Sequence, residues 1–241
     1  MGLDRVQRDW DCYASTDPFW AILTDPNRKN GGWDEETFFE TGRQEISELM
    51  EYLATLGSGL ARGSALDFGC GVGRLSRALA GYFDEVVGLD IAPTMIALAR
   101  AHNAHLGRCT FLENSGPDLA AVRGRNFDLI YSSITLQHMP PRYSRQYVRN
   151  LLELLAPGGQ FVFQLAGEST LSIGNRVLRT LYNEVYRRRV LKDEPPWMDV
   201  YGIPKQRVIG MLKRSGARVL DVQPNDAAGP EWTSYRYVVS R

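Results

Sequence analysis

The clearest helical pattern lies near the start of the chain, between residues 34 and 56. Apolar side chains recur there at intervals of three and four residues, which places them on one face of a helix. Asp34 precedes the stretch and is a residue type that caps helices by accepting a backbone N–H bond. The pattern predicts a helix whose buried face carries Phe38, Phe39, Ile46, Leu49, Met50 and Leu53.

After this helix, short apolar runs alternate with segments of helical periodicity. Short apolar runs bounded by glycine, proline or polar residues are typical of buried strands. Regular strand–helix alternation predicts a parallel sheet, because each parallel connection must cross over the sheet. Strands are predicted at residues 65–68, 86–90, 109–112, 127–132 and 160–165, and helices at 75–80, 93–104 and 142–155.

The last part of the chain predicts one more helix, at residues 205–214, and two strands, at 218–223 and 235–239. These two strands are expected to pair antiparallel at one end of the sheet. The predicted fold class is α/β: a Rossmann-like, mostly parallel seven-stranded sheet with helices on both faces and an antiparallel edge strand.

The connection between the fifth strand and the last helix is unusually long. Residues 167–201 far exceed the usual αβ connection of about two to six residues. An apolar stripe from Leu171 to Leu181 and the run Pro195-Pro196-Trp197 predict a helical cap insertion over the acceptor side of the site. An oligomer interface would use the same stripe, and the oligomeric state stays open.

The length of 241 residues fits a single domain. We expect residues 1–58 to form an N-terminal helical segment that covers the cofactor, and 59–166 to form the cofactor-binding core. The cap insertion would span 167–201, and the C-terminal helix and strand pair 202–241. The aromatic side chains between Trp10 and Trp20 either cover the site or pack on the core.

Charge and cysteine content narrow the partners. Lysine plus arginine equals aspartate plus glutamate at 28 each, so no net field attracts a nucleic acid. Cys12, Cys70 and Cys109 lack the spacing of metal ligands, and no metal is predicted. Without a run of about 18 apolar residues or a signal-peptide pattern, we expect a cytoplasmic protein with no membrane partner.

A glycine-rich loop follows the first predicted strand, in the run DFGCGVGR at residues 67–74. Such a turn brings backbone close to a ligand at a helix N-terminus. A dinucleotide fingerprint would need a third glycine at Arg74, which weakens an NAD-dependent oxidoreductase as the interpretation. Asp67 would repel a pyrophosphate but attract an amino-acid ammonium group.

Asp90 ends the second predicted strand, where open α/β sheets place an acid that bonds ribose hydroxyls. A ribose together with an amino acid fits S-adenosylmethionine. At these residues the chain resembles class I S-adenosylmethionine-dependent methyltransferases. The resemblance covers residues 60–165 and rests on the runs at 67–73, 127–133 and 154–159 together with Asp90.

The resemblance implies a role for each matching residue. The loop glycines would face the methionine part, Asp90 the ribose, and Ile91 and Met95 the adenine. Asn114 stands where many relatives carry an acid that faces the adenine amino group. The side-chain carbonyl of an asparagine can still accept a hydrogen bond from that amino group. The complete predicted cofactor-binding set is Asp67, Gly69, Cys70, Gly71, Gly73, Asp90, Ile91, Met95, Asn114, Ser115 and Ser133.

The acceptor is predicted less closely than the cofactor. Relatives that methylate planar nitrogens carry an Asn/Asp-Pro-Pro-aromatic motif after the fourth strand, where this chain has Ser132-Ser133-Ile134-Thr135. We expect in-line displacement onto an O or N atom of a small-molecule or peptide acceptor. His138 is the candidate general base, with loop packing as its alternative role. A non-catalytic S-adenosylmethionine-binding module is the alternative function.

Overall fold

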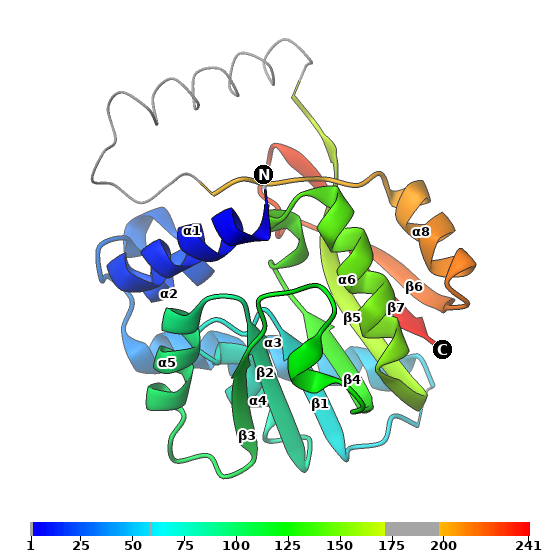
Figure 1. The fold of residues 1–241 in the computed structure, drawn as a ribbon, viewed down its shortest axis with the longest axis horizontal. Coiled ribbons are helices and arrows are strands. Elements are labelled where there is room, and N and C mark those ends of the chain that lie inside the picture. Colours follow the sequence, from blue (N-terminus) through cyan, green and yellow to red (C-terminus); the bar gives the residue numbers. More distant parts are fainter. Residues whose placement is uncertain (1, 58, 172–197) are drawn as a thin grey trace.

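The computed structural model describes residues 2–57, 59–171 and 198–241. Its centre is a seven-stranded sheet in the order β3-β2-β1-β4-β5-β7-β6 (Figure 1). The five strands from β3 to β5 run parallel, and β7 runs antiparallel to both of its neighbours. The strands are β1 (Ser64–Phe68), β2 (Glu85–Asp90), β3 (Cys109–Glu113), β4 (Phe127–Ser132), β5 (Leu155–Ser169), β6 (Arg218–Asn225) and β7 (Trp232–Ser240).

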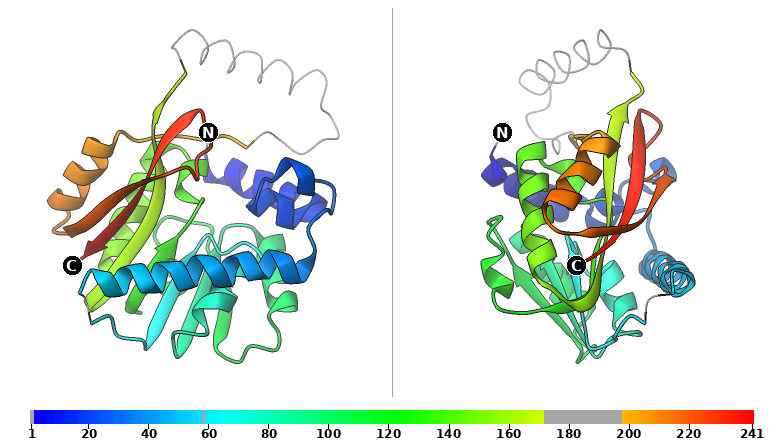
Figure 2. Two further views of the ribbon diagram at one scale, coloured as in Figure 1. Left: turned by 180° about the vertical axis from the view of Figure 1, so that it is seen from behind. Right: turned by 90° about the vertical axis from the view of Figure 1, so that its right-hand side faces the viewer.

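Helices cover the sheet on both faces, as the alternation predicted. The α-helices are α1 (Leu3–Thr16), α2 (Pro18–Ile22), α3 (Glu35–Thr55), α4 (Arg74–Leu79), α5 (Pro93–His102), α6 (Pro141–Glu153) and α8 (Lys205–Arg214). Short 3-10 helices lie at η1 (Pro26–Arg28), η2 (Ala120–Val122) and η3 (Leu136–His138). Seen from behind, α3 crosses the strands on the face opposite α6 and α8 (Figure 2).

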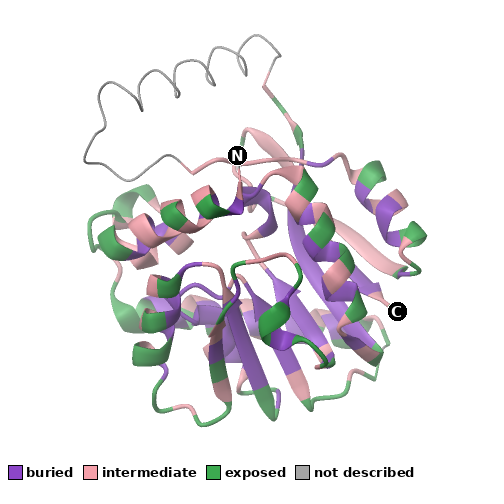
Figure 3. Ribbon diagram, viewed as in Figure 1, coloured by how far each residue is buried: buried purple, intermediate pink, exposed green. Residues whose placement is uncertain are grey.

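Strand β1 shows how the two layers arise. Successive side chains of a strand point to opposite faces. Leu66 therefore packs in the same core as Tyr147 and Leu151 of α6, whereas Ala65 packs in the core formed with Leu49 of α3. Because both faces are covered, the central strands β1, β2, β4 and β5 are buried along most of their length, whereas the edge strands β3 and β6 are more exposed (Figure 3).

The long helix α3 confirms the first prediction. The Asp34 carboxylate accepts a 2.9 Å bond from the Thr37 N–H, so it caps the helix as expected. The buried side chains are the six predicted ones together with Gly42.

The largest differences from the predicted elements lie in the strands near the C-terminal end. β5 begins at Leu155 rather than Gln160, because Leu155 already pairs with Phe127 of β4. The register then shifts, and regular pairing continues from Leu129 with Gln160. The antiparallel strand, β7, lies between β5 and β6. Most of the predicted cap insertion, residues 172–197, lies outside the described residues.

Helix α1 lies over the carboxyl ends of the parallel strands (Figure 1), and hydrogen bonds hold it there. Its Asp11 carboxylate accepts a 3.0 Å bond from the Thr94 N–H in the first turn of α5. Its Gln7 amide donates to Glu113 at the end of β3 over 3.3 Å. These bonds hold the N-terminal helix beside the loops that follow the strands.

Candidate active site

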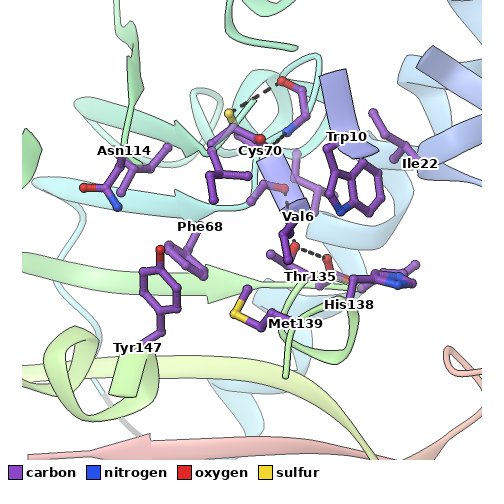
Figure 4. A pocket seen from close by; sticks show the side chains of 18 of the residues that line it. Val6, Trp10, Ile22, Phe68, Cys70, Asn114, Thr135, His138, Met139 and Tyr147 are labelled. Carbon is purple, nitrogen blue, oxygen red and sulfur yellow. Dashed lines mark hydrogen bonds between the residues drawn. The ribbon is translucent and has the colours of Figure 1, made fainter. Parts of the chain in front are cut away.

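A large cavity lies where the loops after β1, β2 and β4 meet α1. The space inside it, counted together with its open mouth, is about 870 Å³. Asn114 and Tyr147 lie at one end and Trp10 and His138 at the other (Figure 4). The lining includes Val6, Ile22, Phe68, Gly69, Cys70, Gly71, Arg74, Asp90, Ile91, Ser133, Thr135 and Met139.

The glycine loop forms one wall with its backbone. Gly69 and Gly71 have φ of 80° and 52°, conformations that side-chain-bearing residues rarely adopt. A Cβ atom at Gly69 would lie 2.2 Å from Thr135, and one at Gly71 would lie 2.6 Å from Ile22. The loop therefore needs glycine at both positions, and its bare backbone lines the cavity.

Asp90 joins the glycine loop to the start of α5. One carboxylate oxygen accepts from the Gly71 N–H and the other from the Ala92 N–H, both at 2.9 Å. Burial raises the pKa of Asp90 above its ordinary value, although these backbone donors oppose the rise. Each carboxylate oxygen can accept a second bond, so Asp90 keeps acceptor capacity for a ligand hydroxyl.

Asp67 lies behind the loop and does not line the cavity. The Ser76 hydroxyl donates to its Oδ2 over 2.6 Å, and its buried Oδ1 has no partner among the described residues. Burial raises the pKa of Asp67 to about 7, with Ser76 and Arg74 opposing the rise. A buried carboxyl with one unbonded oxygen is suited to a cationic neighbour.

The other predicted cofactor contacts divide into two groups. Ile91, Asn114 and Ser133 line the cavity. Gly73 packs on Asn103 and Phe111, Met95 lies in the core with Tyr13 and Phe38, and Ser115 is exposed. Asn114 itself is held by its side-chain N–H bond of 2.6 Å to the Gly116 carbonyl.

His138 lies on η3 and is buried at the α1 end of the cavity. Its Nδ1 lies 2.9 Å from the Asp199 carbonyl, which can only accept, so Nδ1 carries the proton and Nε2 is the acceptor. The Gln137 amide nitrogen lies 3.3 Å from Nε2, at the long end of the hydrogen-bond range. Burial lowers the pKa of His138, so the ring is neutral near pH 7.

A buried polar chain orients this histidine. Gln164 on β5 donates to the Gln137 side-chain oxygen over 2.8 Å and to the Ser234 hydroxyl over 2.6 Å. The first bond fixes which way the Gln137 amide points, and therefore presents its nitrogen to His138. The other two histidines lie elsewhere: His102 contacts Glu35 at 3.1 Å and the Phe19 ring, and His105 is exposed.

Sequence reasoning missed several lining residues. Arg74 is buried at the start of α4, with Nη2 2.7 Å from Glu45 and Nη1 3.2 Å from Thr41. Helix α3 lies close enough to Arg74 for these contacts only because residue 42 is a glycine. A Cβ atom at Gly42 would lie 2.6 Å from the Arg74 carbonyl. Tyr147 was visible only as one apolar position of α6. Val6 and Met139 carried no signal beyond their hydrophobicity.

The turn after β4 contains a strained residue. Ile134 lines the cavity with φ of 53°, which is a rare conformation for a β-branched side chain and costs about 1–3 kcal/mol. Next to it, the Thr135 hydroxyl donates to the Ser133 carbonyl over 2.9 Å.

Among the described residues there is no cluster of side chains suited to a metal ion, and no helix long and apolar enough to span a membrane.

Residues 65–159, which include the glycine loop, Asp90 and His138, match the methyltransferase domain family. Over these residues the chain has the sequence pattern of a methyltransferase domain and the α/β fold described above. The match ends before most of β5, and the sheet order of the whole chain agrees with this fold.

Curated relatives of the methyltransferase domain include two ubiquinone biosynthesis O-methyltransferases. The enzyme of Proteus mirabilis is 30% identical over 132 residues, covering 54% of this chain and 53% of that protein. That of Xanthomonas euvesicatoria is 34% identical over 112 residues, covering 46% of each. The chain thus spans about half the length of the curated relatives it matches.

Solved structures share the fold over nearly the full chain. Magnesium protoporphyrin IX methyltransferase from Synechocystis PCC 6803, with bound SAH, has a TM-score of 0.66 at 18% identity and covers 99% of each chain. A DhpI–SAH complex has a TM-score of 0.60 at 18% identity, covering 98% of this chain and 95% of that one. At this identity the likeness establishes the arrangement of elements around the methyltransferase domain.

Proposed function

We propose that this chain transfers a methyl group from S-adenosylmethionine to a hydroxyl oxygen of a small-molecule acceptor. The observation that carries the proposal is one cavity that has the glycine loop and Asp90 on its walls and a neutral histidine at its α1 end. The O-methyltransferase names of the curated relatives support an oxygen acceptor. The histidine end also argues against a module that only binds the cofactor.

The residues present fit the cofactor. The bare backbone at Gly69 and Gly71 would hold the methionine part, and Asp90 would bond the ribose hydroxyls. Ile91 and Asn114 would contact the adenine, and the buried Asp67 carboxyl, with one unbonded oxygen, lies behind the loop. When bound, S-adenosylmethionine supplies a methyl group activated by its sulfonium.

His138 would act on the acceptor. Its Nε2 lone pair is the proton acceptor, because the Asp199 carbonyl holds the proton on Nδ1. An acceptor hydroxyl that takes the place of the Gln137 N–H at Nε2 would be oriented there, and it would lose its proton to the ring as the O–CH₃ bond forms and the methyl–sulfur bond breaks. Trp10 and Val6 would exclude water from that end of the cavity.

The proposal is tested with purified protein and methyl-labelled S-adenosylmethionine. Calorimetry should show binding of S-adenosylhomocysteine, and incubation with a mixture of phenols should give labelled methyl ethers by mass spectrometry. The negative control is the Gly71→Val variant, whose side chain would collide with Ile22 and fill the space beside the glycine loop. Failure of the wild type to bind S-adenosylhomocysteine would disprove the proposal.

A further inference from the structure

The acceptor end of the cavity is apolar and aromatic. Val6 and Trp10 from α1 face Met139 and His138 from the turn after β4 (Figure 4). Among the described residues, the ionisable side chains that line the cavity besides Cys70, His138 and Tyr147 are Arg74, which begins α4, and Asp90, which ends β2. Among the described residues, the ones that line the α1 end of the cavity therefore carry no formal charge.

Trp10 is placed to hold a planar ring. It contacts the His138 ring edge to face, with the ring centroids 5.4 Å apart, and it contacts Tyr13 in the same way at 5.4 Å. Two contacts of this kind fix the indole orientation, and aromatic pairs favour such geometry. Met139 adds a polarizable side chain that packs well against ring edges.

Negative charge lies behind this end. A second small cavity, lined by Val6, Trp10, Tyr13, His138 and Met198, also borders Asp199 and Asp9, and Asp9 forms an ion pair with Arg5 at 3.6 Å. Trp10 and His138 line both cavities, whereas the two aspartates line only the second one. An anionic acceptor would lose its hydration against apolar walls and would approach these carboxylates, so both effects oppose it.

An ammonium group fits the same end poorly for a different reason. Its nitrogen has no lone pair until it loses a proton, and a histidine whose pKa burial has lowered is a weak acceptor for that proton. A hydroxyl keeps a lone pair while it donates its hydrogen to Nε2. The chemistry of this end therefore selects an uncharged hydroxyl group.

We infer that the acceptor is an uncharged hydroxylated aromatic molecule whose ring lies against Trp10, and that Trp10 sets this preference. The inference rests on the proposed methyl transfer and adds the substrate class. It assigns to α1 the part of the site that recognises the acceptor, separate from the loops that hold the cofactor.

The test compares three probes that share one ring: 4-ethylphenol, which is neutral, 4-hydroxyphenylacetate, which is anionic, and tyramine, which is cationic. Binding to the full chain is measured by calorimetry with saturating S-adenosylhomocysteine present. We expect 4-ethylphenol to bind at least about tenfold more tightly than either charged probe. Equal or tighter binding of a charged probe overturns the inference, as does no binding of 4-ethylphenol at 10 mM.

Variants then separate Trp10 from general effects. Trp10→Ala should weaken 4-ethylphenol about tenfold, whereas Trp10→Phe, which keeps a ring, should recover most of the affinity. Trp33→Phe is the matched control, because Trp33 lies outside the cavity and bonds the Leu23 carbonyl. Unchanged 4-ethylphenol affinity in folded Trp10→Ala removes Trp10 from the acceptor site.

The charge behind the site has its own variant. Asp9→Asn should narrow the preference for 4-ethylphenol over 4-hydroxyphenylacetate by about two- to fivefold. S-adenosylhomocysteine affinity should stay unchanged in every variant. Failure of the wild type to bind S-adenosylhomocysteine overturns the proposed function itself, whereas normal cofactor binding with the wrong probe order overturns the acceptor class alone.

Discussion

Asp90 supports the structure and is expected to bind the ligand. It accepts backbone bonds from Gly71 and Ala92, and its remaining acceptor capacity faces the cavity. Asp90→Ala should weaken S-adenosylhomocysteine binding by about 1.5–3 kcal/mol, the scale for a hydrogen bond to a charged group. Calorimetry measures this, and thermal melting controls for the lost backbone bonds. Unchanged affinity in a folded variant would remove Asp90 from the ligand site.

His138 is expected to affect turnover and leave cofactor affinity alone. His138→Ala should lower kcat about 10²- to 10⁴-fold on a phenol acceptor. Because burial lowers the pKa of His138, the wild-type rate should stay flat from pH 8 down to the ordinary value near 6.5 and fall below it, where Nε2 becomes protonated. Turnover that is unaffected by the substitution would leave His138 a packing residue.

Asp67 should make stability depend on pH. Its pKa is about 7 in the folded chain against an ordinary value of 3.8, so the folded state binds the extra proton between these values. Its contribution to stability is therefore full below pH 4 and is lost as the pH rises through 7. Asp67→Asn should reduce the loss of stability between pH 5 and pH 8, as measured by urea unfolding at each pH. An equal loss in both proteins would contradict the burial argument.

At the scale of elements, α1 and α5 depend on each other. The N-cap of α5 is Ala92, which has no side-chain oxygen, and Asp11 of α1 supplies an acceptor to the Thr94 N–H instead. Asp11→Ala should lower the free energy of unfolding by about 0.5–2 kcal/mol, the usual cost of losing a cap. Asp11→Asn keeps an acceptor and should lose much less in the same denaturation experiment. Equal losses would mean that the carboxylate acts through another contact.

The elements themselves follow closely from local pattern. Periodicity of three and four residues predicted the buried face of α3, and the order of residues 67–90 predicted strand, glycine turn, helix and acid. The carboxyl ends of parallel strands meet at one edge, which is why Gly69, Asp90 and Ser133 reach one cavity. The same periodicity shows which side of a helix is buried but not what that side packs against: only the structure shows that Met95 of α5 lies in a core with Tyr13 and Phe38.

At the scale of the whole molecule, a segment far along the chain returns to support the site. The Asp199 carbonyl holds His138, the Tyr201 N–H donates to the Gln137 carbonyl over 2.7 Å, and the Ile203 N–H donates to the Ala166 carbonyl over 2.8 Å. Gly202 lies so close to β5 that a Cβ atom would come within 1.9 Å of the Gly167 carbonyl. The segment therefore reaches His138 only because residue 202 has no side chain.

Gly202→Ala should displace this segment. We expect a loss of about 1–3 kcal/mol in the free energy of unfolding, typical of forced overpacking, and a lower kcat because His138 loses its carbonyl partner. S-adenosylhomocysteine affinity should be unchanged. The matched control is Gly210→Ala within α8, where the nearest atom is the flexible end of Arg214 at 3.3 Å and the change should be neutral or stabilising. A normal kcat in Gly202→Ala would show that the segment does not position His138.

The sequence by itself determined the α/β class, nearly every element, the glycine loop and Asp90, because these depend on periodicity and on residues close together in the chain. Only the tertiary structure decided that Trp10, Tyr147 and Met139 share a cavity, and that Asp199 sets the proton position on His138. Gly42 and Gly202 are the clearest examples, because each must be glycine to allow close contact with a residue that is distant in the sequence. Such close contacts depend on how the helices, strands and connecting segments pack, and packing is a property of the whole chain that no local window contains.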